Sequence, residues 1–258
     1  MDDFLIFLLV GFLAQVIDGA LGMAYGVISS TVLLGFGVAP AMASASVHTA
    51  EVFTTGAAAA SHAVNRNVNW RLFMPLAAGG SVGGALGAFV LTSIDGDAIK
   101  PFIIVYLAAM GGLILFRAWK AKEPRPFPLR SAAPLGFVGG FLDSVGGGGW
   151  GPSVTSAMVA SGAEARESIG TSNTAEFFVS STISATFLAA LLTGHWDEAE
   201  GLKSHGAAVA GLILGGLLAA PLAGYVARKA PPRPLTIGVG VLVLVLAIYQ
   251  TARQFGLV

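Results

Sequence analysis

The sequence predicts an all-α, polytopic membrane protein built from two inverted five-helix repeats. Its 258 residues are 55% hydrophobic and only 11% charged, and the mean hydropathy is +0.77. Globular domains carry about 25% charged residues, whereas long apolar runs rich in glycine are typical of helices that span a bilayer. Two further observations predict the repeats. A Gly-rich motif occurs twice, and the charge of the loops alternates in sign along the chain.

The Gly-rich motif IDGALGMAYG (residues 17–26) returns as LDSVGGGGWG (residues 142–151). At the same offset, and without a gap, SVHTAEVF (46–53) aligns with TSNTAEFF (171–178). The two halves therefore share one plan. The aligned pairs are Asp18 with Asp143, Gly22 with Gly147, Gly26 with Gly151, His48 with Asn173, Thr49 with Thr174, and Glu51 with Glu176.

The order of apolar runs is the same in both halves. Charged residues and repeated prolines predict an extended linker over 120–134, so that 1–119 form an N-terminal membrane repeat and 135–258 a C-terminal one. In each half we expect two short helices around the Gly-rich break, one long polar span and two plain spans. The expected runs are 4–17, 23–36, 42–63, 72–92 and 98–119, then 135–142, 152–159, 165–193, 206–226 and 235–251.

Loop charge predicts the orientation of these spans. Basic residues gather in three connections, including the linker, and cytoplasmic loops carry an excess of Lys and Arg. The intervening connections are acidic, so we expect them and both termini to face the outside. The long polar spans of the two halves then cross in opposite directions, which makes the repeats inverted. The basic residues are Arg66, Arg71, Arg117, Lys120, Lys122, Arg125, Arg130, Arg228, Lys229 and Arg233; the acidic residues are Asp95, Asp97, Asp197, Glu198 and Glu200.

The short runs around each break leave two topologies open. The first run, 4–17, ends at Asp18 and would make a helix of about 21 Å, shorter than the roughly 30 Å hydrocarbon core. The two short helices of each half either form a re-entrant hairpin or both cross as thin, tilted spans. Their lengths favour the hairpin, so that we expect six full spans and two re-entrant hairpins.

Paired Gly-rich breaks in inverted repeats indicate the central site of a transporter. Glycine permits positive φ and a close approach of backbone N–H groups to a ligand, and a helix that starts after a break directs its positive dipole end toward an anion. Tight hairpin packing is the alternative role. No Lys or Arg lies in the middle of a span, so hydroxyls, amides and dipoles must hold an anion. The candidate substrate-binding residues are Gly22, Tyr25, Gly26, Ser46, His48, Thr49, Gly147, Gly148, Gly149, Trp150, Thr171, Asn173 and Thr174. The alternative to substrate binding is, for the hydroxyls, a hydrogen bond to a carbonyl of their own helix. For the aromatic residues the alternative is packing.

Four carboxylates are candidates for proton coupling or for structural hydrogen bonds. Asp18 and Asp143 either cap the helix starts or titrate during transport. Glu51 and Glu176 lie in the middle of spans, where an unpaired carboxylate costs several kcal/mol and is expected to be protonated or hydrogen-bonded. His48 precedes Glu51 by one turn and lies on the same helix face. The two side chains could form a proton relay or a simple hydrogen-bonded pair.

Other function classes find no support in the sequence. The chain has no cysteine and a net charge of zero, so thiol catalysis and thiolate metal sites are excluded, and no basic face indicates nucleic acid. It contains no nucleotide-binding motif, and an acid–base pair of His48 and Glu51 lacks a nucleophile or metal set. We therefore expect no enzyme activity, no cofactor and no metal. The expected partners are a small anion and the lipid bilayer, with a homo-oligomer left open.

The motif residues also carry a resemblance to a known family. The first motif, followed by ASASVHTAEVFTTG (43–56) and NVNW (67–70), and the second motif, followed by IGTSNTAEFF (169–178), resemble the sulfite exporter TauE/SafE family over essentially the whole chain. The resemblance implies a bacterial inner-membrane carrier for small sulfur-containing anions such as sulfite or organosulfonates. The residues alone indicate a transporter with a site at the membrane midplane, or alternatively an ion channel whose pore is lined by the broken helices. In either case both breaks and both polar spans should converge on one cavity.

Overall fold

The computed structural model describes residues 2–117, 125–196, 199–229 and 232–255, and this part of the chain is helical with no strand. The helices of the first half are α1 (Asp2–Leu21), α2 (Tyr25–Gly35), α3 (Pro40–Val64), α4 (Trp70–Ser93) and α5 (Gly96–Arg117). The second half contains a 3₁₀ turn (Leu129–Ser131), α6 (Ala132–Gly146), a π-helical turn η2 (Gly151–Thr155), α7 (Ser156–Ala160), α8 (Ala165–Leu192), α9 (Ala199–Lys229) and α10 (Pro232–Gln254). Lys120, Lys122, Asp197 and Glu198, used above to predict the orientation, lie outside the described residues.

Several expected boundaries are wrong: α6 continues to Gly146 and does not end at Leu142, and α9 begins at Ala199 and not at Gly206. Helix α1 does not stop at Asp18 but continues for one more turn to Leu21, because the N–H of Gly22 still bonds the carbonyl of Asp18 at 2.5 Å and the backbone reverses only at Gly22 (φ +65°). A 20-residue helix is about 30 Å long, so α1 is not a short helix. Helix α6 begins at Ala132, inside the expected linker, after the 3₁₀ turn that ends at Ser131.

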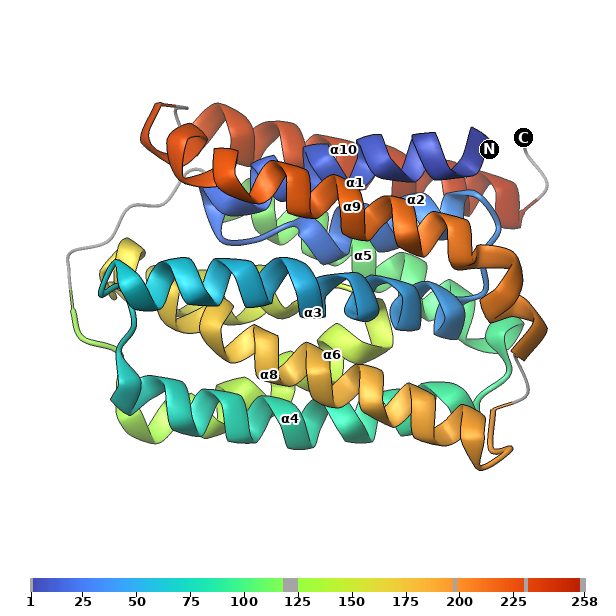
Figure 1. Ribbon diagram of the computed structural model, residues 1–258, viewed down its shortest axis with the longest axis horizontal. Helices are drawn as coiled ribbons and strands as arrows, with labels where there is room; N and C mark the ends of the chain where they lie inside the picture. Colours follow the sequence, from blue (N-terminus) through green and yellow to red (C-terminus); the bar gives the residue numbers. More distant parts are fainter. Residues whose placement is uncertain (1, 118–124, 197–198, 230–231, 256–258) are drawn as a thin grey trace.

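The helices form a bundle in which each break turns the chain back on itself (Figure 1). Helix α1 begins and α2 ends at the right-hand end of the bundle, whereas α6 begins and α7 ends at the left-hand end (Figure 1). Across the halves, α1 packs along α9 and α4 packs along α6. Helices α3 and α8 pack on each other, as do α5 and α10. The two hairpins therefore enter from opposite ends and bring their breaks together inside the bundle.

Glycines allow the closest helix pairs to form. A Cβ on Gly83 of α4 would collide with the backbone carbonyl of Phe137 in α6, and a Cβ on Gly215 of α9 would collide with that of Leu8 in α1. Gly79 makes the same type of approach, to the carbonyl of Ala133. The four-residue spacing of these glycines, which the sequence indicated as packing faces, thus places two helix backbones in direct contact.

The outer surface of the bundle is apolar, as a lipid-facing surface requires. Phe102, Val105 and Leu218 are examples of large exposed hydrophobic side chains. Among the described residues, three helices are long and apolar enough to cross a membrane: Trp70–Ser93, Ala98–Phe116 and Ala165–Leu192. Helix α3 is as long, but its polar residues lower its hydropathy, and most of them are buried against other helices. The chain is therefore a multi-pass membrane protein.

The helix contact at Gly83 gives a stability prediction. Gly83→Ala should lower the free energy of unfolding by about 1–3 kcal/mol, because overpacking forces α4 and α6 apart. Gly112→Ala in α5 is the matched control, since no atom lies within 4 Å of its added Cβ and alanine favours a helix by up to about 1 kcal/mol. Thermal unfolding of the purified protein in detergent measures both. Equal losses for the two variants would contradict the close approach.

Candidate functional site

The two Gly-rich breaks contact each other at the centre of the bundle. Gly147 (φ +68°) and Gly148 (φ +154°) provide the positive φ of the second break, as Gly22 does in the first. A Cβ on Gly26 would lie 2.7 Å from the Cα of Gly148, and a Cβ on Gly151 would lie 2.6 Å from the Cα of Met23. Glycine is therefore required here both for backbone conformation and for contact between the halves.

Asp143, in the last turn of α6, caps the helical segment that follows the second break. Its Oδ1 accepts hydrogen bonds from the backbone N–H groups of Gly149 (2.6 Å) and Trp150 (2.9 Å). Asp18 has the equivalent place in α1, but its Oδ1 accepts only the N–H of Tyr25, at 3.4 Å. The N–H donors that the sequence suggested for an anion are thus bonded to the protein's own carboxylates in this structure.

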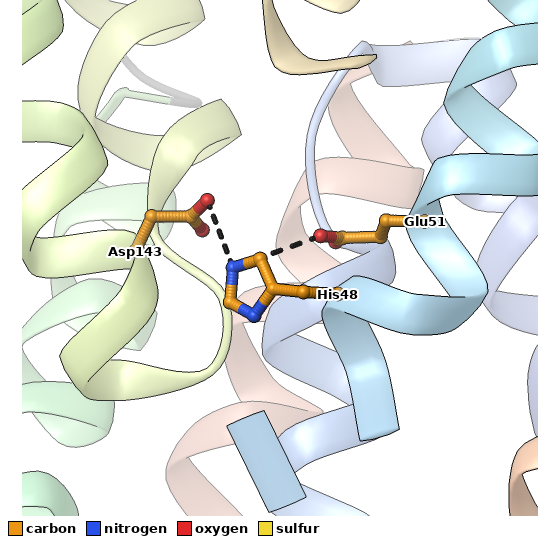
Figure 2. Close-up of side chains that lie close together, drawn as sticks. All are labelled: His48, Glu51 and Asp143. Atoms are coloured by element: carbon orange, nitrogen blue, oxygen red, sulfur yellow. Dashed lines mark hydrogen bonds and ion pairs between the residues drawn. The ribbon is translucent and has the colours of Figure 1, made fainter. Parts of the chain in front are cut away.

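His48 of α3 connects the two halves (Figure 2). Its Nε2 lies 3.2 Å from Oδ2 of Asp143 and 3.9 Å from Oε2 of Glu51. Its Nδ1 lies 2.8 Å from the carbonyl oxygen of Ser44. Because a carbonyl can only accept, Nδ1 carries a proton and Nε2 faces the two carboxylates. The Ser44 hydroxyl donates to the carbonyl of Ser144 at 2.5 Å, a second polar link between the halves.

A small cavity lies where the breaks meet α3 and α8. All four candidate carboxylates line it, and they expose only 1–7% of their surface. The space open to the centre of a water-sized sphere is about 10 Å³, roughly enough for one water. No Lys or Arg of the described residues lines the cavity. Its lining consists of Asp18, Ala24, Tyr25, Gly26, Val27, Glu51, Asp143, Gly148, Gly149, Trp150, Gly151, Pro152 and Glu176.

Several predicted substrate-binding residues lie away from this cavity. The hydroxyls of Thr49 and Thr174 donate to carbonyls of their own helices, at Ala45 and Gly170. The hydroxyl of Thr171 accepts the N–H of Asn69. Gly22 and Gly147 shape the breaks without lining the cavity, and the hydroxyl of Ser46 and Oδ1 of Asn173 are buried without a hydrogen-bond partner.

Both aromatic residues of the repeated motif line the cavity and also bond neighbouring helices. The indole N–H of Trp150 donates to the carbonyl of Ser172 at 3.1 Å, and the hydroxyl of Tyr25 donates to that of Leu212 at 3.0 Å. Sequence reasoning missed Ser180, whose hydroxyl donates to Oε2 of Glu51 at 3.2 Å, and Ser44. Ser44 precedes His48 by one helical turn, which could have indicated it. No local signal pointed to Ser180.

One group of described residues has the composition of a metal site. Potential ligand atoms of His48, Glu51 and Asp143 all lie within 4.8 Å of one another. Both oxygens of Asp143 are already engaged: Oδ1 accepts two backbone hydrogen bonds, and Oδ2 lies 3.2 Å from Nε2 of His48. A metal would have to replace one of these bonds, so the geometry suits a hydrogen-bonded network better than a coordination sphere.

Comparison with known proteins gives one family and two relatives. The family model described as Sulfite exporter TauE/SafE matches residues 7–250. The chain is similar to the "Probable membrane transporter protein YtnM" of Bacillus subtilis (strain 168), at 40% identity over 247 residues, 93% of this chain and 80% of that protein. It is also similar to the "Probable membrane transporter protein ORF9" of Sinorhizobium sp, at 30% identity over 143 residues, 54% of each chain. No solved structure matches the chain.

The unequal caps predict unequal costs of removing the two aspartates. Asp143→Ala leaves two backbone donors without a partner, removes the nearer carboxylate from Nε2 of His48, and should lower the free energy of unfolding by about 3–5 kcal/mol. Asp143→Asn keeps an acceptor oxygen for the backbone and should cost less. Asp18→Ala loses one long hydrogen bond, worth about 1 kcal/mol. Thermal unfolding in detergent ranks the three variants, and an Asp18→Ala variant as unstable as Asp143→Ala would contradict the capping role.

The first break contains a strained residue. Ala24 has φ +119°, a conformation that costs an L-residue on the order of 1 kcal/mol or more, and its counterpart in the second motif is Gly149. We expect Ala24→Gly to raise the thermal unfolding temperature. Ala60→Gly, at an exposed position inside α3, should lower it, because glycine weakens a helix by about 1 kcal/mol. A loss of stability in both variants would argue against strain at Ala24.

Proposed function

Because the chain belongs to the sulfite exporter TauE/SafE family and is a membrane transporter, we propose that it is a secondary transporter of small sulfur-containing anions. Sulfite and organosulfonates are the substrates that we propose, in keeping with the family's description. The observation that carries the proposal is the cavity itself. It is formed where backbone breaks from both halves meet, which is the arrangement of central sites in secondary transporters.

We propose that the two halves are inverted repeats that move against each other. Two features support this relation. The first helix of each half packs along the fourth helix of the other, and the hairpins enter the bundle from opposite ends (Figure 1). Rocking of one half against the other would then open the cavity to one end at a time. Residues 1–119 and 135–258 would be the moving units, joined by the linker over 120–134.

The proposed location is the bacterial inner membrane, with the linker in the cytoplasm and both termini on the periplasmic side. Helices α3, α5 and α9 end, and α4, α6 and α10 begin, at the left-hand end of the bundle in Figure 1. The connections at this end hold the basic residues that indicate a cytoplasmic face. Helix α1 begins and α10 ends at the opposite end (Figure 1).

We propose that transport is coupled to protons through the cavity carboxylates, with Glu51 as the first candidate. Four buried carboxylates cannot all remain ionised beside one imidazole without a large desolvation cost. Entry of an anion would add a further negative charge. Proton uptake by Glu51, next to His48, would offset that charge. The residue that corresponds to His48 in the second half is Asn173, which cannot titrate. The proton pathway would therefore use the first half.

The size of the cavity favours a carrier over a channel. An open channel requires a continuous aqueous path, whereas the cavity has room for about one water-sized sphere. Sulfite or a sulfonate could enter only after the halves have moved apart. A carrier therefore accounts for the enclosed site and for the broken helices together.

Sulfite flux into proteoliposomes tests the proposed function. We expect flux that saturates with sulfite and increases with an inward proton gradient. Glu51→Gln should reduce the gradient-driven flux about tenfold or more and remove its dependence on pH, because glutamine cannot carry a proton. Glu167→Gln is the matched control, since Glu167 is exposed and its Oε1 accepts from Asn69 away from the cavity.

Two results would overturn parts of this proposal. Single-channel currents in a planar bilayer would replace the carrier with a channel. Saturable flux that ignores both the proton gradient and Glu51→Gln would keep the carrier and remove proton coupling through Glu51. Absence of flux and of binding for sulfite and for sulfonates would overturn the substrate class.

A further inference from the structure

The charge of the central cavity is opposite to the one expected for a simple anion site. Four carboxylates line it, and His48 is the one side chain in contact with them that can carry positive charge among the described residues. His48 lies closest to Asp143, at 3.2 Å. Glu51 shares this imidazole with Asp143 at the longer distance of 3.9 Å, and Asp18 and Glu176 have no ion pair among the described residues.

Positive helix ends do not balance these charges. The backbone donors of Gly149 and Trp150 are bonded to Asp143, and that of Tyr25 is bonded to Asp18. At the other side of each break, α1 and α6 point their negative ends at the cavity, and neither has a basic residue in its last turn. The backbone and side chains around the cavity thus both favour a cation.

Glu176 gives a separate indication of a missing ligand. It lies on α8, 93% of its surface is buried, and it lines the cavity. Neither oxygen of its carboxylate has a hydrogen-bond partner among the described residues. Buried carboxylates are normally paired, so an unpaired one that faces a cavity points to a group that the cavity receives.

We propose that the cavity binds an ammonium group between Asp18, Glu51 and Glu176, in the same transport cycle that carries the sulfur-containing anion. The inference rests on the proposed transport function and specifies the chemistry of its site. A zwitterionic amino-sulfonate would bring the ammonium group on the substrate itself. A free ammonium ion would bring the same group beside a simple anion.

Size and hydrogen bonding both match an ammonium group. The cavity has room for about one water-sized sphere, and an –NH₃⁺ group is close to that size. Such a group has three N–H donors. Three carboxylates, one each from α1, α3 and α8, retain oxygens without a partner: Oδ2 of Asp18, Oε1 of Glu51 and both oxygens of Glu176. Charge-assisted hydrogen bonds of this type are the strongest that a protein offers a ligand.

Two sulfonates that differ only at one group test the proposal. 2-Aminoethanesulfonate carries an ammonium group where 2-hydroxyethanesulfonate carries a hydroxyl. Calorimetry on the full-length protein in detergent, at fixed pH with choline as the other cation, gives the Kd of each. We expect the amino compound to bind about tenfold or more tightly if the substrate supplies the group. If a free ion supplies it, ammonium chloride should strengthen binding of the hydroxy compound or of sulfite about tenfold.

Glu176→Gln separates a lost site from a misfolded protein. The variant should abolish the tenfold preference or the ammonium effect, because one charged acceptor is gone. Its affinity for 2-hydroxyethanesulfonate without ammonium should rise, since one negative charge that repels the anion has been removed. Glu167→Gln on the same helix should behave as wild type. Loss of all binding in Glu176→Gln, with Glu167→Gln intact, would contradict the assigned role of Glu176.

The remaining outcomes separate failure of the ammonium site from failure of the proposed substrate class. Equal affinities for the two sulfonates, together with no effect of ammonium chloride, would mean that protons alone balance the cavity. An equal effect of potassium chloride would contradict recognition of the N–H donors, because K⁺ has none. The site would then bind any cation of this size. If neither sulfonate nor sulfite binds under any condition, the failure lies with the proposed substrate class.

Discussion

The carboxylate of Asp143 is the group on which the centre of the molecule depends. One oxygen caps the helical segment after the second break, and the other faces His48 from the opposite half. A backbone break inside a membrane protein is tolerated only when its polar groups are bonded or reach water. Asp143 provides that bonding and at the same time ties α6 to α3. The same side chain therefore stabilises the break and one contact between the halves.

Glycine makes this arrangement sterically possible. In a lipid environment helices gain no hydrophobic driving force from each other, so close backbone contact and dispersion must hold them. Gly83 and Gly215 bring α4 onto α6 and α1 onto α9, and these two pairs fix where each hairpin enters. Gly26 and Gly148 then allow the two breaks to touch. A larger residue at any of these points would separate the halves and enlarge the cavity between them.

Much of the fold and the set of central carboxylates could be predicted from the sequence, because the repeat is carried by residues with strong local meaning. The helices and both breaks follow from apolar runs and glycine motifs, and the offset that aligns Asp18 with Asp143 also aligns Glu51 with Glu176. The extent of α1 could not be predicted, since a carboxylate followed by glycine is typical of a helix end and yet the helix continues to Leu21. The partners of each side chain also depend on packing between the halves. No pattern within one half could reveal that His48 faces Asp143, that Ser180 bonds Glu51, or that Thr49 and Thr174 bond their own helices.

The shared plan of the halves carries unequal chemistry, and this follows from a few substitutions at equivalent positions. Where one half has His48, the other has Asn173, whose Oδ1 is buried without a partner. Where the second break has Gly149, the first has the strained Ala24. Asp143 accepts two short backbone bonds, whereas Asp18 accepts one long one. Motion at the first break therefore disrupts fewer and weaker interactions than motion at the second. The repeated motif therefore gives two breaks of unequal strength, with the larger number of hydrogen bonds at the second.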